Sequence, residues 1–151
     1  MAMDAKQIAS TLNRVKLFEG LTTDQINQVL KISSKKKYSQ GQTVFSRGDE
    51  STEILLVISG LFEVQNAGGP VSVVKESEIV GEMGVITEQF RSADVVSIRD
   101  SVAISIPRNE LFKLINSDVN FGFIFYRNLT HIVCDYLRNN NIVLEFSNLL
   151  G

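Results

Sequence analysis

The stretch that decides the fold runs from Val80 to Ser97 and reads VGEMGVITEQFRSADVVS. Its first half is an apolar residue followed by Gly81-Glu82-Met83-Gly84-Val85. Its second half is Arg91-Ser92-Ala93, followed after one intervening residue by the apolar Val95. Either half alone indicates little, because a Gly-Glu pair is typical of turns and an arginine nine residues after a glutamate usually forms a surface ion pair. The stretch indicates a fold only when the order of its two halves and the segments around them are considered together.

Short β-rich segments surround this stretch throughout residues 35–107. Turn-forming Gly, Ser, Asp, Asn and Pro residues separate them at intervals of roughly ten residues, which is typical of a β-sandwich or barrel. The predicted strands are Thr43–Phe45, Ile54–Ile58, Leu61–Val64, Val71–Lys75, Ala93–Ile98 and Val102–Ile106.

Helical periodicity replaces the β pattern at both ends of the chain. Residues 1–34 form a predicted N-terminal helical segment, with helices over Ala5–Val15 and Thr22–Ile32. In the second of these, Thr22 and Gln25 are spaced as a capping box.

After the β-rich region, residues 108–138 carry two predicted C-terminal helices, Asn109–Ile115 and one from Asp118 to Arg138, and residues 139–151 form a tail. We therefore expect an α+β fold that is mainly β. It is an antiparallel jelly-roll barrel or sandwich with N-terminal helices, a short helix within 80–97 and two C-terminal helices.

The stretch 80–97 resembles the phosphate-binding cassette of the cyclic nucleotide-binding domain family. In that family, Gly-Glu with a small and an apolar residue is followed, after a variable stretch, by Arg, a small residue and Ala. The resemblance covers most of residues 15–138, and Arg91-Ser92-Ala93 looks most like the sensor domains of catabolite activators. It also extends to the regulatory subunits of protein kinase A. The upstream positions that agree are Leu17, Phe18, Gly20, Leu21, Gly41, Val44, Phe45, Gly48, Asp49, 54–57 and Gly60.

The resemblance implies a ligand that is a compact monoanion with a ribose 2′-hydroxyl, and the cassette residues suit it. The planar fork of Arg91 would bind phosphate oxygens, Ser92 would add a hydroxyl donor, and Glu82 would accept from the 2′-hydroxyl. Gly81 and Gly84 would let the backbone come close, and a helical turn at Met83–Ile86 would direct N–H groups at the anion. The predicted ligand contacts are Gly81, Glu82, Met83, Gly84, Val85, Arg91, Ser92 and Ala93.

The base would lie against apolar strand residues, for which Val71, Val73 and Val95 are the candidates. Tyr136 or Arg138 of the last helix would cover it, as a residue of the corresponding helix does in related domains. A hydroxyl after the cassette arginine occurs in cGMP-selective members, but the catabolite activators also have Ser there and prefer cAMP. We therefore favour cAMP over cGMP.

Three departures from the family pattern lie in or near the cassette. Phe90 stands where many members have Pro, and Glu76-Ser77-Glu78 fills a loop that often contains Gly. Asp94 adds a carboxylate near an anionic ligand, but it alternates with Ala93 and Val95 and is therefore expected to point outward.

The helix from Asp118 to Arg138 carries two apolar seams, and both must be buried. The first seam is Val119, Phe123, Tyr126, Thr130, Val133 and Leu137, and the second is Phe125, Leu129, Ile132 and Tyr136. One seam would lie on the barrel. The other would meet a second copy of the chain, giving a homodimer, or would be covered by the apolar tail at 142–150.

Composition excludes several classes of function. The 15 Lys and Arg residues against 17 Asp and Glu give a net charge of −2, which argues against a general nucleic-acid binder. A single cysteine, Cys134, excludes an internal disulfide and a cysteine-based zinc site, and a single histidine, His131, disfavours a metalloenzyme. We expect both to be packing or surface residues.

No apolar block typical of a signal peptide or of a membrane-spanning helix is present, so we expect a cytoplasmic protein without membrane contact. Too few residues follow Arg138 for a helix-turn-helix, so we expect no direct DNA binding. We expect a non-catalytic receptor for cAMP or cGMP, with no other cofactor and no metal, that signals to a separate effector protein by moving its C-terminal helices. The alternative is a ligand-free scaffold for protein interaction or dimerisation.

Overall fold

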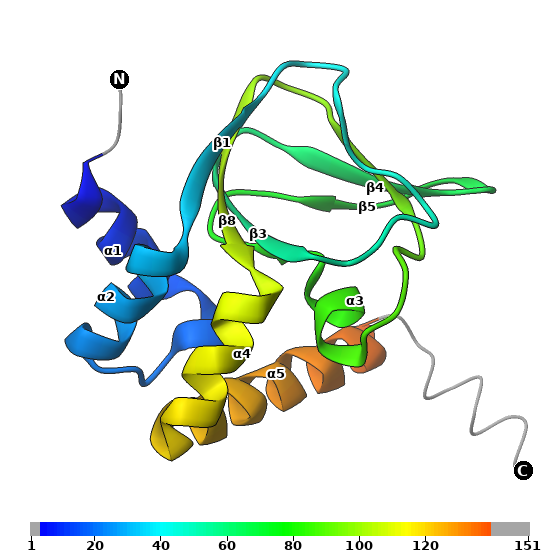
Figure 1. Ribbon diagram of the computed structural model, residues 1–151. Helices are drawn as coiled ribbons and strands as arrows, with labels where there is room; N and C mark the ends of the chain where they lie inside the picture. Colours follow the sequence, from blue (N-terminus) through cyan, green and yellow to red (C-terminus); the bar gives the residue numbers. More distant parts are fainter. Residues whose placement is uncertain (1–3, 140–151) are drawn as a thin grey trace, which may run out of the picture.

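The computed structural model describes residues 4–139, and its strands form two four-stranded antiparallel sheets (Figure 1). The first sheet has the order β1 (Ser34–Tyr38), β8 (Ser101–Pro107), β3 (Glu53–Ser59) and β6 (Ile79–Val80). The second has the order β2 (Thr43–Phe45), β7 (Asp94–Ser97), β4 (Phe62–Asn66) and β5 (Gly69–Val74). The expectation of a mainly β, antiparallel jelly roll is confirmed, and the two sheets make it a sandwich.

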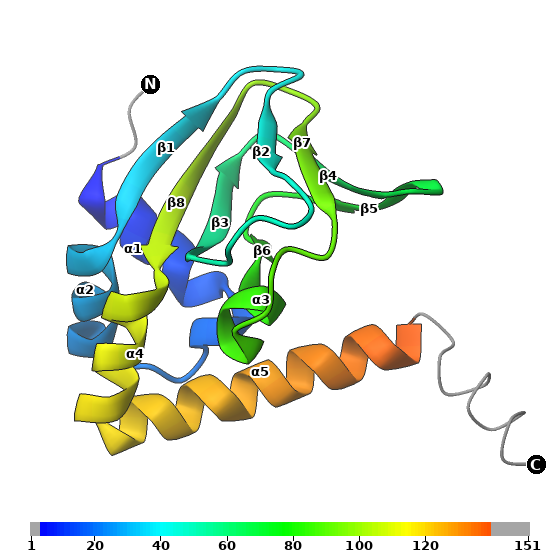
Figure 2. The same ribbon diagram turned by 45° about the vertical axis from the view of Figure 1, so that its right-hand side comes forward.

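The helices lie on one side of this β-roll (Figures 1 and 2). The N-terminal elements are α1 (Ala5–Arg14), the 3₁₀ turn η1 (Lys16–Phe18) and α2 (Thr23–Ile32), and α3 (Glu82–Thr87) lies between β6 and β7. The C-terminal elements are α4 (Arg108–Ser117) and α5 (Val119–Asn139). The predicted capping box is present, since Thr22 N–H donates to Gln25 Oε1 over 2.9 Å and Gln25 N–H donates to Thr22 Oγ1 over 3.2 Å.

Strand β3 is buried on both faces, which explains its uninterrupted apolar sequence. Its Ile54, Leu56 and Ile58 belong to the core that the first sheet shares with the helices. Its Leu55 and Val57 belong to a second core between the two sheets.

The side chains of Asn128 and Gln25 fasten the N-terminal helices to the C-terminal ones. The buried amide of Asn128 in α5 donates to the carbonyl oxygens of Leu17 and Glu19 over 2.9 and 2.8 Å. The Gln25 amide of α2 donates over 3.1 Å to Asp118, which lies at the junction of α4 and α5. The helices therefore form one layer against the first sheet. No helix within residues 4–139 is long and apolar enough to cross a membrane.

Candidate ligand-binding site

Arg91 lies at the centre of the predicted site and is 6% exposed. Backbone hydrogen bonds hold its main chain against the loop that follows β2. Its N–H donates to the carbonyl oxygen of Asp49 over 2.8 Å, and its own carbonyl oxygen accepts from Gly48 N–H over 2.9 Å. The cassette arginine is thereby attached to a glycine turn more than forty positions earlier in the chain.

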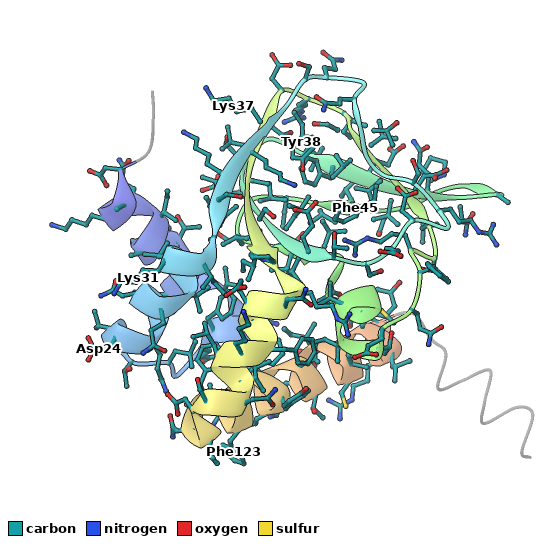
Figure 3. The ribbon with its side chains drawn as sticks, viewed as in Figure 1. Asp24, Lys31, Lys37, Tyr38, Phe45 and Phe123 are labelled. Atoms are coloured by element: carbon teal, nitrogen blue, oxygen red, sulfur yellow. The ribbon has the colours of Figure 1, made fainter. Side chains whose placement is uncertain are left out.

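The guanidinium of Arg91 is enclosed by one ring and two carbonyl groups. Its Nη1 donates to Gly81 O over 2.9 Å and its Nη2 donates to Glu53 O over 2.6 Å. Its Cζ lies 3.6 Å from the centre of the Phe45 ring. The Nε atom is buried and has no hydrogen-bond partner among the described residues. Figure 3 shows Phe45 within the β-roll.

This guanidinium is a buried cation without a carboxylate partner in residues 4–139, because none of their ion pairs includes Arg91. Burial lowers the pKa of Arg91, and the charges of Glu53, Glu82 and Asp49 partly oppose that decrease. Burial also raises the pKa of Glu82, which its own backbone N–H and Arg91 oppose. Since a buried charge is costly without a counter-ion, this arrangement favours the binding of an anion.

Gly81 and Gly84 are needed for packing within the cassette. Gly81 has a φ of 90°, and a Cβ there would lie 2.6 Å from Arg91 Nη1 and 2.9 Å from Phe45 Cε2. A Cβ at Gly84 would overlap the side chain of Ser51, whose hydroxyl donates to Gln89 O over 2.6 Å. Gly84 therefore lets α3 approach the loop before β3.

The other predicted contacts lie at different depths around Arg91. Glu82 begins α3 and is half-buried, whereas Met83 is 59% exposed. Val85 is fully buried in the core beneath the helices, so its side chain anchors α3. Ser92 is exposed, and Ala93 is intermediate. The predicted helical turn is confirmed, since α3 spans Glu82–Thr87.

The family model for the cyclic nucleotide-binding domain matches residues 35–118, more than half of the chain. This chain belongs to the cyclic nucleotide-binding domain family. The predicted family is thereby confirmed.

Curated relatives of this domain include a cyclic AMP receptor protein and a cGMP-dependent phosphodiesterase. The cyclic AMP receptor protein of Thermus thermophilus is 30% identical over 104 residues, which are 66% of this chain and 48% of that protein. The cGMP-dependent 3′,5′-cGMP phosphodiesterase A of Dictyostelium discoideum is 27% identical over 122 residues, 80% of this chain and 14% of that protein. The chain thus spans about half, or less, of these relatives.

Solved structures share the fold. A cyclic nucleotide-binding domain from Methylobacillus flagellatus superposes with a TM-score of 0.79 at 19% identity, covering 94% of this chain and 83% of that one. The catabolite activator protein of Thermus thermophilus superposes with a TM-score of 0.74 at 25% identity, covering 88% of this chain and 63% of that one.

Strand register decides which side chains of this cyclic nucleotide-binding domain face the space between the sheets. Val64 pairs with both Val95 and Ser72, and Val95 is buried in the core between the sheets. Val73 pairs with Glu63 on the opposite face and is 52% exposed. These pairings place Val64 between Val95 and the exposed Ser72 on one face of the sheet, and Val73 on the other face.

The other three predicted base contacts are also largely exposed. Val71 lies at a bulge in the pairing of β4 with β5, has no partner in that pairing and is 49% exposed. Tyr136 is 49% exposed and Arg138 is exposed. Both belong to the last turns of α5, which extend beyond α3 (Figure 2).

The departures from the family pattern leave Arg91 undisturbed. Asp94 is exposed, and its carboxylate accepts from Arg47 N–H over 2.8 Å, so it points outward as expected. Ser77, in the loop before the cassette, adopts a φ of 69°, a left-handed conformation that favours glycine. Phe90 is 65% exposed.

Sequence analysis missed Phe45 and Glu53 as residues of the site. Phe45 belonged to the matched family pattern, but nothing in the sequence shows that its ring meets Arg91. Glu53 contributes its backbone carbonyl oxygen, for which the side-chain type carries no signal.

Proposed function

We propose that this chain is a receptor module whose Arg91 binds the phosphate of a cyclic nucleotide, cAMP in preference to cGMP. The observation that carries the proposal is the buried guanidinium, which has only carbonyl partners and an Nε without a hydrogen bond. An anion at this position would supply the missing counter-charge and accept from the unpartnered donor.

The remaining roles follow from position. Half-buried Glu82 accepts from the ribose 2′-hydroxyl, and exposed Ser92, next to Arg91, donates to the phosphate. Val64, Ser72 and Val95 contact the base, in place of the earlier candidates Val71 and Val73. Similarity to proteins named as a cyclic AMP receptor and a catabolite activator supports the preference for cAMP.

Tyr136 or Arg138 of α5 would cover the base. Because Figure 2 shows the last turns of α5 extending beyond α3, closure over the ligand would require α5 to move relative to the cassette.

Signalling would proceed from the cassette to the helices. Glu88, which ends α3, forms an ion pair with Arg108, the first residue of α4. A ligand that displaces α3 would therefore act directly on α4 and, through it, on α5. We propose that the module is non-catalytic and cytoplasmic and that these helices form its output to a separate effector protein.

The second copy of the chain is the partner that α5 supports best. The second seam of α5 is buried at Phe125 (0% exposed) and Leu129 (8%), with Tyr136 at 49%, whereas the first seam faces outward except at Val133, which packs partly against the core. In that first seam Val119 is 85% and Phe123 64% exposed. Figure 3 shows Phe123 at the outer edge of the helical layer. A heptad-spaced apolar stripe of this kind favours pairing with an equal stripe, that is, a homodimer through α5. The tail at 142–150, the other proposed cover, lies outside the described residues.

Calorimetric titration of the parent chain with cAMP and, separately, with cGMP tests the proposed ligand. We expect binding at micromolar Kd or tighter, with cAMP the stronger. Because hydrogen bonds to charged groups are worth roughly 1.5–3 kcal/mol each, Arg91→Ala should weaken binding about a hundredfold or more. The exposed Arg99 supplies the matched control, and Arg99→Ala should bind like the parent. A folded parent that binds neither nucleotide would favour the alternative, a ligand-free scaffold.

Sedimentation equilibrium tests the homodimer. We expect the parent to sediment as a dimer and Phe123→Glu to sediment as a monomer, because a charge in the stripe would be buried on pairing. Val73→Glu introduces the same charge at a half-exposed apolar residue outside the stripe and should leave the dimer intact. A monomeric parent would contradict the homodimer.

A further inference from the structure

The ring of Phe45 lies directly against the guanidinium of Arg91, with 3.6 Å between the ring centre and Cζ. We propose that Phe45 is the positioning residue that holds Arg91 ready for the phosphate. The inference rests on the proposed function, since it assigns a role in nucleotide binding to a residue that need not touch the nucleotide.

Phe45 is placed for this role by the sheet that carries it. It is the last residue of β2, pairs with Val95 of β7 and is 6% exposed. The carbonyl oxygens of Gly81 and Glu53 hold the two terminal nitrogens of Arg91, and the ring covers the guanidinium itself. Ring and carbonyl groups together therefore restrict Arg91 to one orientation, in which Nε keeps an unused donor.

An arginine side chain has many rotamers, and restricting them beforehand improves binding. A cation held over an aromatic face is attracted to it, and more strongly when both groups are desolvated, as they are here. Without the ring, a smaller fraction of molecules would hold Arg91 in the binding orientation, and the apparent affinity would fall by that fraction.

Phe45 also belongs to the apolar core between the sheets, so it has an ordinary packing role as well. Leucine can fill much of that apolar space but has no aromatic face. Phe62 offers a matched comparison, because it is fully buried in the same core and packs against the Tyr38 ring, with centroids 5.4 Å apart.

The first experiment compares the affinities of the parent, Phe45→Leu and Phe62→Leu for cAMP by calorimetry, with urea unfolding of each. Both variants should lose stability. Only Phe45→Leu should lose affinity, by about tenfold, which corresponds to roughly 1.4 kcal/mol. Equal affinities of Phe45→Leu and the parent would overturn the positioning role, as would an equal loss in Phe62→Leu.

The second experiment needs no ligand, so it separates this inference from the proposed function. In a ¹⁵N-labelled sample, the Arg91 Nε–H resonance is assigned by its absence from Arg91→Lys. Because the guanidinium lies over the ring, we expect an upfield-shifted signal in the parent that returns toward ordinary values in Phe45→Leu and not in Phe62→Leu. An unshifted parent signal would refute the stacking even if Phe45→Leu failed to fold. A parent that shows the shift but binds no nucleotide would refute the proposed function, and would leave the stacking of Phe45 on Arg91 without a role in binding.

Discussion

Gly81→Ala should be among the most damaging single-methyl changes in this domain, for two reasons that add. Gly81 has a φ of 90°, a conformation that costs a residue with a side chain about 1–2 kcal/mol. The added Cβ would lie 2.6 Å from Arg91 Nη1, 2.9 Å from Phe45 Cε2 and 3.1 Å from Glu53 O. Overpacking of this kind costs about 1–3 kcal/mol, so the free energy of unfolding should fall by about 2–5 kcal/mol.

Gly41→Ala separates the two contributions. Gly41 has nearly the same backbone conformation, with a φ of 87°, but nothing lies within 4 Å of a Cβ placed there. It should therefore lose only the conformational part, about 1–2 kcal/mol. Urea unfolding at equal slopes gives both values by linear extrapolation.

The cassette variant should also lose nucleotide affinity, because the methyl group displaces the Arg91 guanidinium from the carbonyl oxygen of Gly81. Gly41→Ala should keep it. If the two variants were equally stable, within about 0.5 kcal/mol, the packing of Gly81 against Arg91 and Phe45 would be refuted.

Three further changes have defined outcomes. Asn128→Ala should lower the free energy of unfolding by about 2–3 kcal/mol, because it leaves two backbone carbonyl groups without their donor. As a control, Thr130→Ala at an exposed position should change it by less than about 0.5 kcal/mol. Burial raises the pKa of Glu82 above its ordinary value, so ionisation of this carboxyl opposes folding. The melting temperature of Glu82→Gln should therefore match that of the parent at acidic pH, where Glu82 is neutral, and exceed it increasingly as the pH rises through the raised pKa. Asp94→Ala should leave cAMP affinity within about twofold in calorimetry, because the carboxylate is exposed, screened by salt and directed away from the site.

Local patterns in the sequence were sufficient to predict the family and most of the helices and strands. A capping box depends on side chains three residues apart, and the structure has it at Thr22 and Gln25. Strand β1 has the sequence Ser-Lys-Lys-Lys-Tyr, in which only Tyr38 is buried, so the sequence indicates a solvated strand edge at Lys35–Lys37 without giving the bounds of a strand. Lysine side chains on an edge strand stay in solvent, so they destabilise the sheet little. Lysine-rich edges also discourage pairing with other chains.

The two seams of α5 show a limit of periodicity. Both have apolar residues at helical spacing, so the sequence predicts two buried faces without saying which lies on the β-roll. The structure buries the seam of Phe125 and Leu129, and the close approach at Gly122 indicates why. A Cβ there would lie 3.0 Å from the carbonyl oxygen of Ile115, so α5 meets α4 on the glycine side and leaves Phe123 outside.

The base pocket shows a second limit, because strand alternation has a period of two and an error of one residue reverses the face. The valines of β5 stand at 71, 73 and 74, and the sequence alone does not show where the alternation is interrupted. Regular alternation from the buried Val74 places Ser72, a less apolar and exposed residue, on the inner face, and the bulge then interrupts the alternation at Val71. The proposed pocket thereby acquires a hydroxyl beside the base, which the apolar pattern did not predict.

The identity of the partners of Arg91 lies beyond any side-chain pattern, because two of the three are backbone carbonyl oxygens. A carboxylate at either position would have formed an ion pair and left the guanidinium neutralised. Carbonyl groups orient the cation without neutralising it, so the site keeps a positive charge in a buried place. That charge suits the proposed monoanionic ligand, so we expect Gly81, which brings one of these carbonyl oxygens within 2.9 Å of Arg91, to matter for binding as well as for the turn.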